Sequence, residues 1–220
     1  MNVETVYGVD FSGAEDAGDN VWVAELDVSG SPELTACQRA PVALADCYDG
    51  EPTTDRAATL DALASFVASL PATAAVGFDF SFSVPARVAR GALDAETWPE
   101  VADAVAGCAD ADAFAEQCVE WTQAHTDDTY LKRETDAEWG AFSPYHFFVA
   151  AQTYHGIADV LHPLRDQACV VPFDARTDRP VVAEVYPAGT LDALGLCREG
   201  YKGRGEGETR RRERNVDGLA

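Results

Sequence analysis

The stretch that decides the fold is residues 74–85, AAVGFDFSFSVP, an apolar run that contains a single carboxylate, Asp79. Its first residues hardly alternate between apolar and polar, which predicts a strand covered on both faces, as in a parallel sheet. An ionised carboxylate inside such a strand is strongly unfavourable unless something compensates its charge. Asp79 is therefore expected just past the end of this strand, or beside a partner.

Three β-favouring runs precede this strand and predict an antiparallel meander. They are residues 5–9 (TVYGV), 21–28 (VWVAELDV) and 33–41 (ELTACQRAP). The first run stops at Asp10. A helix is predicted over residues 56–70, because Thr54 and Asp55 offer an N-cap and the apolar residues that follow recur on one face.

The second half of the chain is predicted to be mainly helical. Apolar residues near helical spacing over about 86–165 indicate a helical insertion after the fourth strand. A fifth strand is predicted over 181–185 (VVAEV). A last helix could begin at Thr209, but the chain stops before it reaches average length, so we expect a truncated C-terminal helix in a single domain over residues 1–220.

This order of elements is that of a ribonuclease H-like fold. It predicts an α/β domain whose five-stranded mixed sheet has the order 3-2-1-4-5, with helices on both faces. The first, fourth and fifth strands are then parallel neighbours ~4.8 Å apart. Acidic residues just beyond their C-terminal ends converge at the sheet edge where open α/β sheets bind ligands. Those residues are Asp10, Asp79 and Glu184.

Three carboxylates at one sheet edge repel one another, and a hard divalent cation with oxygen ligands is the usual remedy. Mg²⁺ or Mn²⁺ is therefore the expected cofactor. With a second metal ~3.5–4 Å away, such a site could hold a phosphodiester, activate a water and stabilise the departing oxygen. The pattern predicts a metal-dependent phosphodiester hydrolase, a nuclease that acts by metal-activated water.

Five stretches between about Thr5 and Arg212, nearly the whole chain, together resemble a known family. They are YGVDFSGA, VGFDFSFSVP, SPYHFFVAAQTYHGIADVL, EVYPAGTLDALGL and GYKGRGEGETRRR. The family is the uncharacterised domain of unknown function 429, whose members are described as predicted ribonuclease H-like nucleases. The resemblance implies that Asp10, Asp79 and Glu184 bind metal.

The resemblance also implies contacts with a phosphate group. Ser12 and Gly13, in the turn after the first strand, would offer a hydroxyl and backbone N–H groups to a phosphate oxygen. Lys202, in GYKG, would contact the phosphate or the leaving group. Family members commonly continue into a final helix with an acidic D-x-x-D-A motif, whereas this chain ends in NVDGLA and its Asp217 does not match.

The charge balance bears on which partners the protein has. The chain carries 38 acidic against 16 basic residues, a net charge of −22, and this excess is spread along the sequence in the manner of proteins from salt-loving microbes. The absence of a basic face argues against nucleic acid as a partner. The argument is weaker in molar salt, where charge steering is screened within ~3 Å, so nucleic acid stays a possible substrate.

The remaining features concern location. The six cysteines form no C-x-x-C pair, no apolar run approaches the ~20 residues of a membrane span, and the N-terminal MNVETVYGVD does not resemble a signal peptide. These features predict a soluble cytoplasmic protein with reduced thiols and no membrane partner. They leave the oligomeric state open.

Two other functions fit the same pattern. Actin-like ATPases share this strand order and place an Asp-bearing turn after the first strand, so the chain could bind a nucleotide or a phosphometabolite. It could also be a non-catalytic interaction domain that has lost full metal coordination. Arg133, in LKRETD, is a further candidate for a ligand contact, the alternative being that this polar linker is simply a surface loop.

Overall fold

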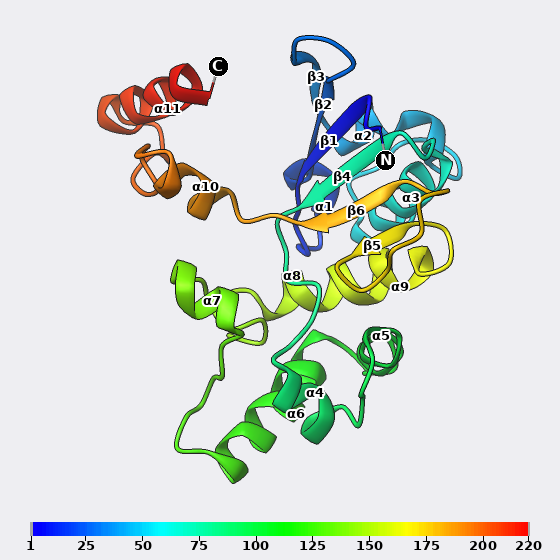
Figure 1. The fold of residues 1–220 in the computed structure, drawn as a ribbon, viewed down its shortest axis with the longest axis vertical. Helices are drawn as coiled ribbons and strands as arrows, with labels where there is room; N and C mark the ends of the chain where they lie inside the picture. The colour runs from blue at the N-terminus through cyan, green and yellow to red at the C-terminus, as the bar shows by residue number, and fades with distance from the viewer. Residues whose placement is uncertain (1, 220) are drawn as a thin grey trace. The chain divides into compact units, whose positions relative to one another are not determined.

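The structure, a computed structural model, describes residues 2–219, and these form two compact units, residues 2–184 and 185–219. The first unit contains the sheet and most of the helices, and the second contains two helices (Figure 1). The sequence predicts one domain over residues 1–220. The sheet and helical insertion of that prediction both lie in the first unit.

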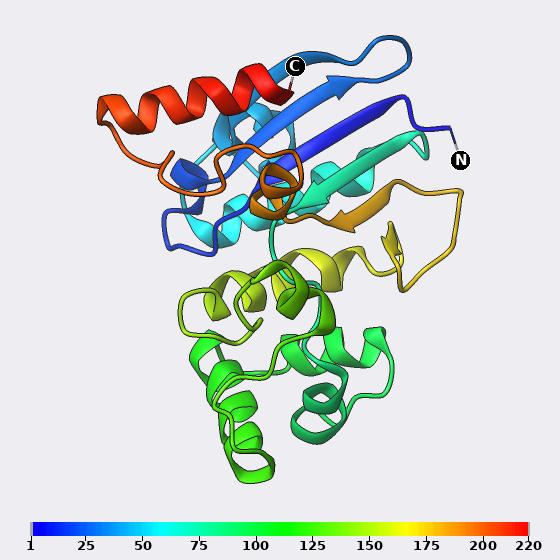
Figure 2. The same cartoon turned by 60° about the vertical axis from the view of Figure 1, so that its left-hand side comes forward.

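Six strands form one mixed sheet in the order β3-β2-β1-β4-β6-β5 (Figure 2). They are β1 (Thr5–Asp10), β2 (Trp22–Asp27), β3 (Glu33–Arg39), β4 (Ala74–Phe78), β5 (Cys169–Val171) and β6 (Val181–Glu184). The meander β1–β2–β3 is antiparallel, and β4, β6 and β5 run parallel to β1. The α/β class, the meander and the relative order of the five predicted strands are confirmed.

The prediction of five strands is wrong, because β5 adds a sixth at the edge beyond β6. This strand has only three residues and is followed directly by Pro172. A run this short has no periodicity of its own. Its pairing with β6 defines it as a strand, and that pairing is a tertiary property.

Helix α3 (Arg56–Ser69) covers one face of the sheet and matches the predicted helix closely. Asp55 caps it by accepting a hydrogen bond from the Ala58 N–H at 3.0 Å. Phe66 of α3 packs edge-on against Tyr7 of β1, with ring centroids 5.2 Å apart. The short helices α1 (Ala17–Asn20), α2 (Ala40–Ala43) and η1 (Ala45–Cys47) pack beside α3.

The two faces of the sheet differ in how deeply they are buried. On the face toward α3, the core contains Val9, Val23, Val76, Phe78 and Val182, all buried. The other face carries small residues that are only half-buried, namely Gly8, Ala75, Gly77 and Ala183. The predicted helical covering is therefore seen on the first face, and the covering of the second face stays a prediction.

The predicted insertion is helical throughout most of its length. It contains α4 (Ala86–Ala92), α5 (Trp98–Ala106), α6 (Ala111–His125), α7 (Glu134–Trp139), α8 (Ala150–His155), the π-helical segment η2 (Gly156–Leu161) and α9 (His162–Leu164). Segment η2 contacts both α3 and α5, which joins the insertion to the core under the sheet. Among residues 2–219, no helix has the length and apolar character needed to cross a membrane.

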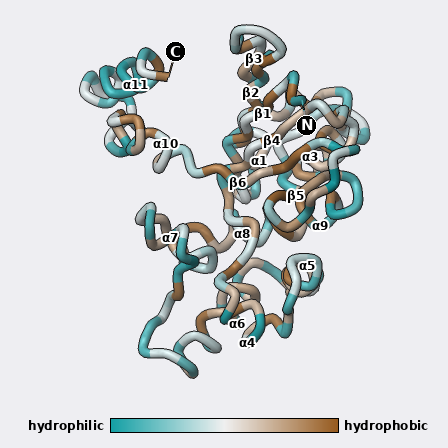
Figure 3. The backbone as a smooth tube through the Cα atoms, in the orientation of Figure 1, coloured by the Kyte–Doolittle hydropathy of each residue, from teal (hydrophilic) through white to brown (hydrophobic). Residues whose placement is uncertain are grey.

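The second unit contains α10 (Pro187–Ala193) and α11 (Glu206–Leu219). The final helix begins three residues before the predicted Thr209 and has 14 residues, so the expectation that it would stop short of average length is wrong. Helix α11 is mostly hydrophilic (Figure 3), which is why apolar periodicity did not show it. Its Arg212 donates hydrogen bonds of 2.6 Å to the carbonyls of Tyr201 and Gly203 and so ties the glycine-rich loop to the helix.

Candidate functional site

Two of the three predicted carboxylates lie at neighbouring strand ends. Strands β1 and β4 are parallel and pair Val9 with Phe78, so the next residue of each chain segment, Asp10 and Asp79, extends the same register. Asp10 is the last residue of β1 and is exposed, whereas Asp79 follows β4 and is partly buried. The expectation that Asp79 lies just beyond its strand, beside Asp10, is confirmed.

The surroundings of Asp79 change its acidity. Burial raises the pKa of the Asp79 carboxyl to about 6, against an ordinary value of 3.8. The N–H of Phe11 donates to Asp79 Oδ1 at 2.8 Å and partly opposes this rise. The negative charge of Asp10 raises the pKa further, and so does the hydrogen bond that protonated Asp79 donates to it. This pair therefore favours either a shared proton or a bound cation.

Aromatic packing holds the backbone around Asp79. Strand β4 ends at Phe78, after which Phe80 turns into the core, with its ring centroid 4.6 Å from Phe11 and 5.2 Å from Phe82. Gly156 makes room for this ring, because a Cβ at that position would come within 2.3 Å of Phe80. The phenylalanines flanking Asp79 thus fix the strand end.

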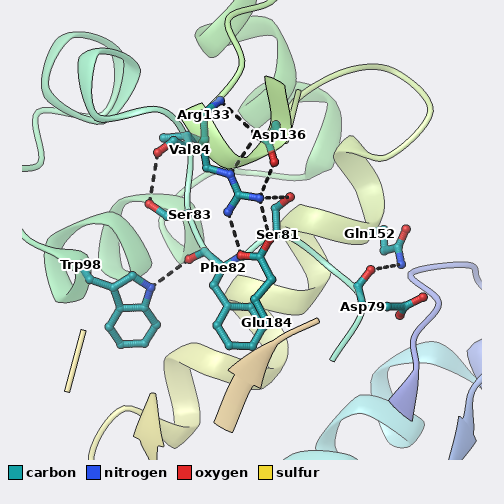
Figure 4. A network of polar contacts seen from close by, with 10 residues as sticks. All are labelled: Asp79, Ser81, Phe82, Ser83, Val84, Trp98, Arg133, Asp136, Gln152 and Glu184. Atoms are coloured by element: carbon teal, nitrogen blue, oxygen red, sulfur yellow. Dashed lines mark hydrogen bonds and ion pairs between the residues drawn. The ribbon is translucent and has the colours of Figure 1, made fainter. Parts of the chain in front are cut away.

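Gln152 of α8 joins the two strand ends. Its side-chain amide donates to the carbonyl of Phe11 at 3.1 Å and to the carbonyl of Asp79 at 3.2 Å, and Figure 4 shows the second of these bonds. Nothing in the sequence pointed to this residue, because a lone glutamine in a helix matches no motif. It positions the backbones of both segments that carry the carboxylates.

The turn after β1 contains Ser12 and Gly13. Gly13 lies so close to α8 that a Cβ there would be 2.8 Å from the carbonyl oxygen of Ala151, and its own carbonyl accepts a hydrogen bond from Arg56 at 3.0 Å. Ser12 Oγ accepts a hydrogen bond from the Ala14 N–H at 3.3 Å. The turn therefore has a defined shape beside Asp10, and the phosphate contacts of Ser12 and Gly13 stay a prediction.

Glu184 takes part in a different set of contacts. It pairs in register with Phe78, whereas Asp79 is one residue beyond the end of β4. Glu184 Oε2 accepts hydrogen bonds from the Phe82 N–H at 2.9 Å and from Arg133 Nη1 at 2.7 Å. Figure 4 shows the Glu184 carboxylate directed toward Arg133 rather than toward Asp79.

Arg133, which precedes α7, is the centre of this second cluster. It forms ion pairs with Glu184 at 2.5 Å and with Asp136 at 2.7 Å, and it donates to Ser81 Oγ at 3.3 Å. Burial alone would lower the pKa of Arg133, but hydrogen bonds and charges from Glu184 and Asp136 outweigh burial and raise it above its ordinary value. The guanidinium therefore stays charged and neutralises both acids.

The two neighbouring carboxylates, Asp10 and Asp79, are of the kind that binds Mg²⁺. Mg²⁺ is commonly held by one or two protein carboxylates, with waters and substrate phosphates as the other ligands, and Asp10 and Asp79 supply this donor set. Within residues 2–219, no group of three or more His, Cys, Asp or Glu side chains has metal-binding geometry. Glu184 would join such a site only if it gave up its ion pair with Arg133 and bound the cation instead.

Two further residues of the prediction belong to the second unit. Lys202 is exposed in the loop before α11, and its phosphate contact stays a prediction. Asp217 lies in the last turn of α11. Asn215, two residues earlier, is buried and bonds to both the N–H and the carbonyl of Cys197, at 2.8 and 2.9 Å.

Comparison of the chain with protein-family models, curated proteins and solved structures finds no match.

The raised pKa of Asp79 predicts how stability depends on pH without metal. The carboxyl has a pKa of about 3.9 in an unfolded chain and about 6 in the folded protein. The folded state therefore holds this proton more tightly. The stabilisation is complete below about pH 4 and is lost as the pH rises through about 6.

Asp79→Asn removes this titration while keeping an acceptor for the Phe11 N–H. In EDTA, we compare the unfolding free energies of the two proteins. The difference, variant minus wild type, should rise by on the order of 2 kcal/mol between about pH 4 and pH 8. Urea denaturation at constant salt measures both proteins, and taking their difference cancels the contributions of carboxyls that do not interact with Asp79. A difference that is constant with pH would contradict the raised pKa.

Proposed function

We propose that this protein is a metal-dependent phosphodiester hydrolase with a ribonuclease H-like fold. The observation that carries the proposal is the Asp10–Asp79 pair at the C-terminal ends of adjacent parallel strands. The strand order supports the fold, because the five predicted strands follow the order expected for it and β5 extends the edge. The carboxyl edge of parallel strands is also where α/β sheets usually bind ligands.

In this proposal, Asp10 and Asp79 hold Mg²⁺ or Mn²⁺. The cation, when bound, supplies the positive charge that polarises a phosphodiester and makes a water more acidic. Phe11 and Gln152 fix the strand ends through the hydrogen bonds described above, so that the two carboxylates keep their separation. Ser12 and Gly13 contact a phosphate oxygen from the adjacent turn.

Glu184 has a conditional part in this proposal. Its carboxylate is neutralised by Arg133 in the structure, and it becomes a third ligand when a cation competes successfully with the guanidinium. The same ion pair favours a second candidate, a non-catalytic interaction domain, because it removes one acid from the predicted ligand set. Metal binding distinguishes the two functions.

The test combines calorimetry with cleavage assays on the full chain in molar KCl. The proposal predicts saturable Mn²⁺ or Mg²⁺ binding and metal-dependent cleavage of labelled DNA, RNA or branched substrates, abolished by EDTA. Absence of saturable binding would favour the interaction domain. A rise in melting temperature with ATP, without cleavage, would favour a nucleotide-binding protein.

A further inference from the structure

The segment between α7 and α8 carries an unusual concentration of exposed aromatic rings. Phe142, Phe147 and Phe148 are 51%, 67% and 67% exposed, and Trp139 is 39% exposed. Burying such rings is what ordinarily stabilises a fold. Large aromatic groups left in solvent within ten residues of one another therefore indicate a binding surface.

The rings form a continuous cluster in which some pairs are stacked and others tilted. His146 lies at its centre, with centroids 4.6 Å from Phe142 and 4.4 Å from Phe147, both in stacked orientation. Phe147 and Phe148 are 4.1 Å apart. We call these four residues, Phe142, His146, Phe147 and Phe148, the aromatic platform. It is a cluster of rings, of which Phe147 and Phe148 are each 67% exposed, rather than one isolated apolar side chain.

The segment that carries the platform is anchored by Tyr145. Tyr145 is fully buried, and its hydroxyl bonds to Thr122 Oγ1 at 2.8 Å and to the Leu131 N–H at 2.7 Å. A tight turn adds hydrogen bonds from the His146 N–H to the Ser143 carbonyl and from the Val149 N–H to the His146 carbonyl, at 2.9 and 2.8 Å. A ligand would therefore meet a surface that needs little ordering.

The platform is directly connected to the candidate site. It leads into α8, whose Gln152 bonds to the Asp79 carbonyl. Gln152 is four positions after Phe148, so their Cα atoms are at most about 15 Å apart. A run of about four stacked nucleotides, at roughly 3.4 Å each, covers this distance.

The segment that carries the platform lacks charged side chains, which favours contacts that do not depend on charge. In a chain where a quarter of the residues are charged, the 20 residues 139–158 contain no Asp, Glu, Lys or Arg. Carboxylates elsewhere on the chain would repel a polyanion, whereas this segment has none. It also lacks cations for phosphates, so a nucleic acid would bind there through its bases.

We propose that the aromatic platform stacks the unpaired bases of a single-stranded nucleic acid whose backbone passes Asp10 and Asp79. This inference rests on the proposed function and names its substrate class. Stacking on aromatic side chains accepts any base, because every base has a π-face. It also persists in salt that screens phosphate contacts.

The test measures binding apart from cleavage. Fluorescein-labelled oligothymidylate and a matched DNA duplex are titrated with the full chain in EDTA, by fluorescence anisotropy at 0.5 and 3 M KCl. We expect the single strand to bind more tightly than the duplex, with affinity nearly independent of salt. Phe147→Ala/Phe148→Ala should weaken single-strand binding at least about tenfold, since each stacked base contributes about that much.

Two variants distinguish stacking from other causes. Phe147→Leu/Phe148→Leu keeps apolar bulk but removes the π-faces, and it should lose binding nearly as strongly as the alanine pair. Leu34→Ala/Val42→Ala removes exposed apolar groups on β3 and α2 and should bind like the wild type. Equal loss in this control, or wild-type affinity in either phenylalanine pair, would overturn the proposal.

Two other outcomes would also overturn it. Failure of the wild type to bind the oligothymidylate would remove the ligand class, and wild-type dimers that dissociate in the Phe147→Ala/Phe148→Ala variant would assign the platform to a second copy. Cleavage of a small phosphodiester such as bis(p-nitrophenyl) phosphate by the wild type with Mn²⁺ tests the carboxylate pair separately. Binding and catalysis can therefore fail independently.

Discussion

Asp79→Asn is expected to reduce Mn²⁺-dependent phosphodiester cleavage by about 100-fold or more, because loss of a positioned catalytic group generally lowers the rate by about 10²–10⁴. The substitution removes one negative charge from the pair that is proposed to hold the cation. It keeps an oxygen that accepts from the Phe11 N–H, whose bond to Asp79 is 2.8 Å in the wild type. The fold around the strand end should therefore survive.

Calorimetry gives the second part of this result. The Mn²⁺ affinity of Asp79→Asn should fall together with the cleavage rate, since the proposed function assigns both to the same carboxylate. Asp61→Asn, a matched change at an exposed position of α3, should leave both quantities near wild-type values. Wild-type cleavage by Asp79→Asn would remove Asp79 from the mechanism.

Arg133→Met is expected to lower the free energy of unfolding by about 3 kcal/mol, the range for removing one partner of a buried ion pair. The Asp136 side chain is 4% exposed, so it would be left as a buried anion without its cation. Glu184 is 31% exposed and can recover hydration, which makes its share smaller. The loss should therefore depend mainly on Asp136.

Urea denaturation of three proteins tests this assignment. Arg90→Met, at an exposed position of α4, controls for loss of an arginine and should change stability by less than about 0.5 kcal/mol. Arg133→Met/Asp136→Leu removes both charges and should recover part of the stability. If Arg133→Met were no less stable than Arg90→Met, the cluster would have no structural role.

The candidate site was only partly predictable from the sequence. Asp10 and Asp79 could be paired in advance because each ends a β-favouring run and parallel neighbours align their C-terminal ends. Glu184 also ends its strand, yet the register sets it opposite Phe78, and Arg133 from the insertion binds it. A sequence shows which residues end strands but not which cation reaches them from 51 residues away.

The sequence by itself determined the α/β class, the meander, the helix over residues 56–69 and the place of Asp79 just after its strand. These features depend on local periodicity, on helix caps and on the penalty for burying a charge. All of these can be recognised from residues that are close together in the sequence. Only the tertiary structure decided the edge strand β5, the bridge made by Gln152 and the neutralisation of Glu184. Those features depend on contacts between residues that are distant in the chain, and local sequence patterns do not predict such contacts.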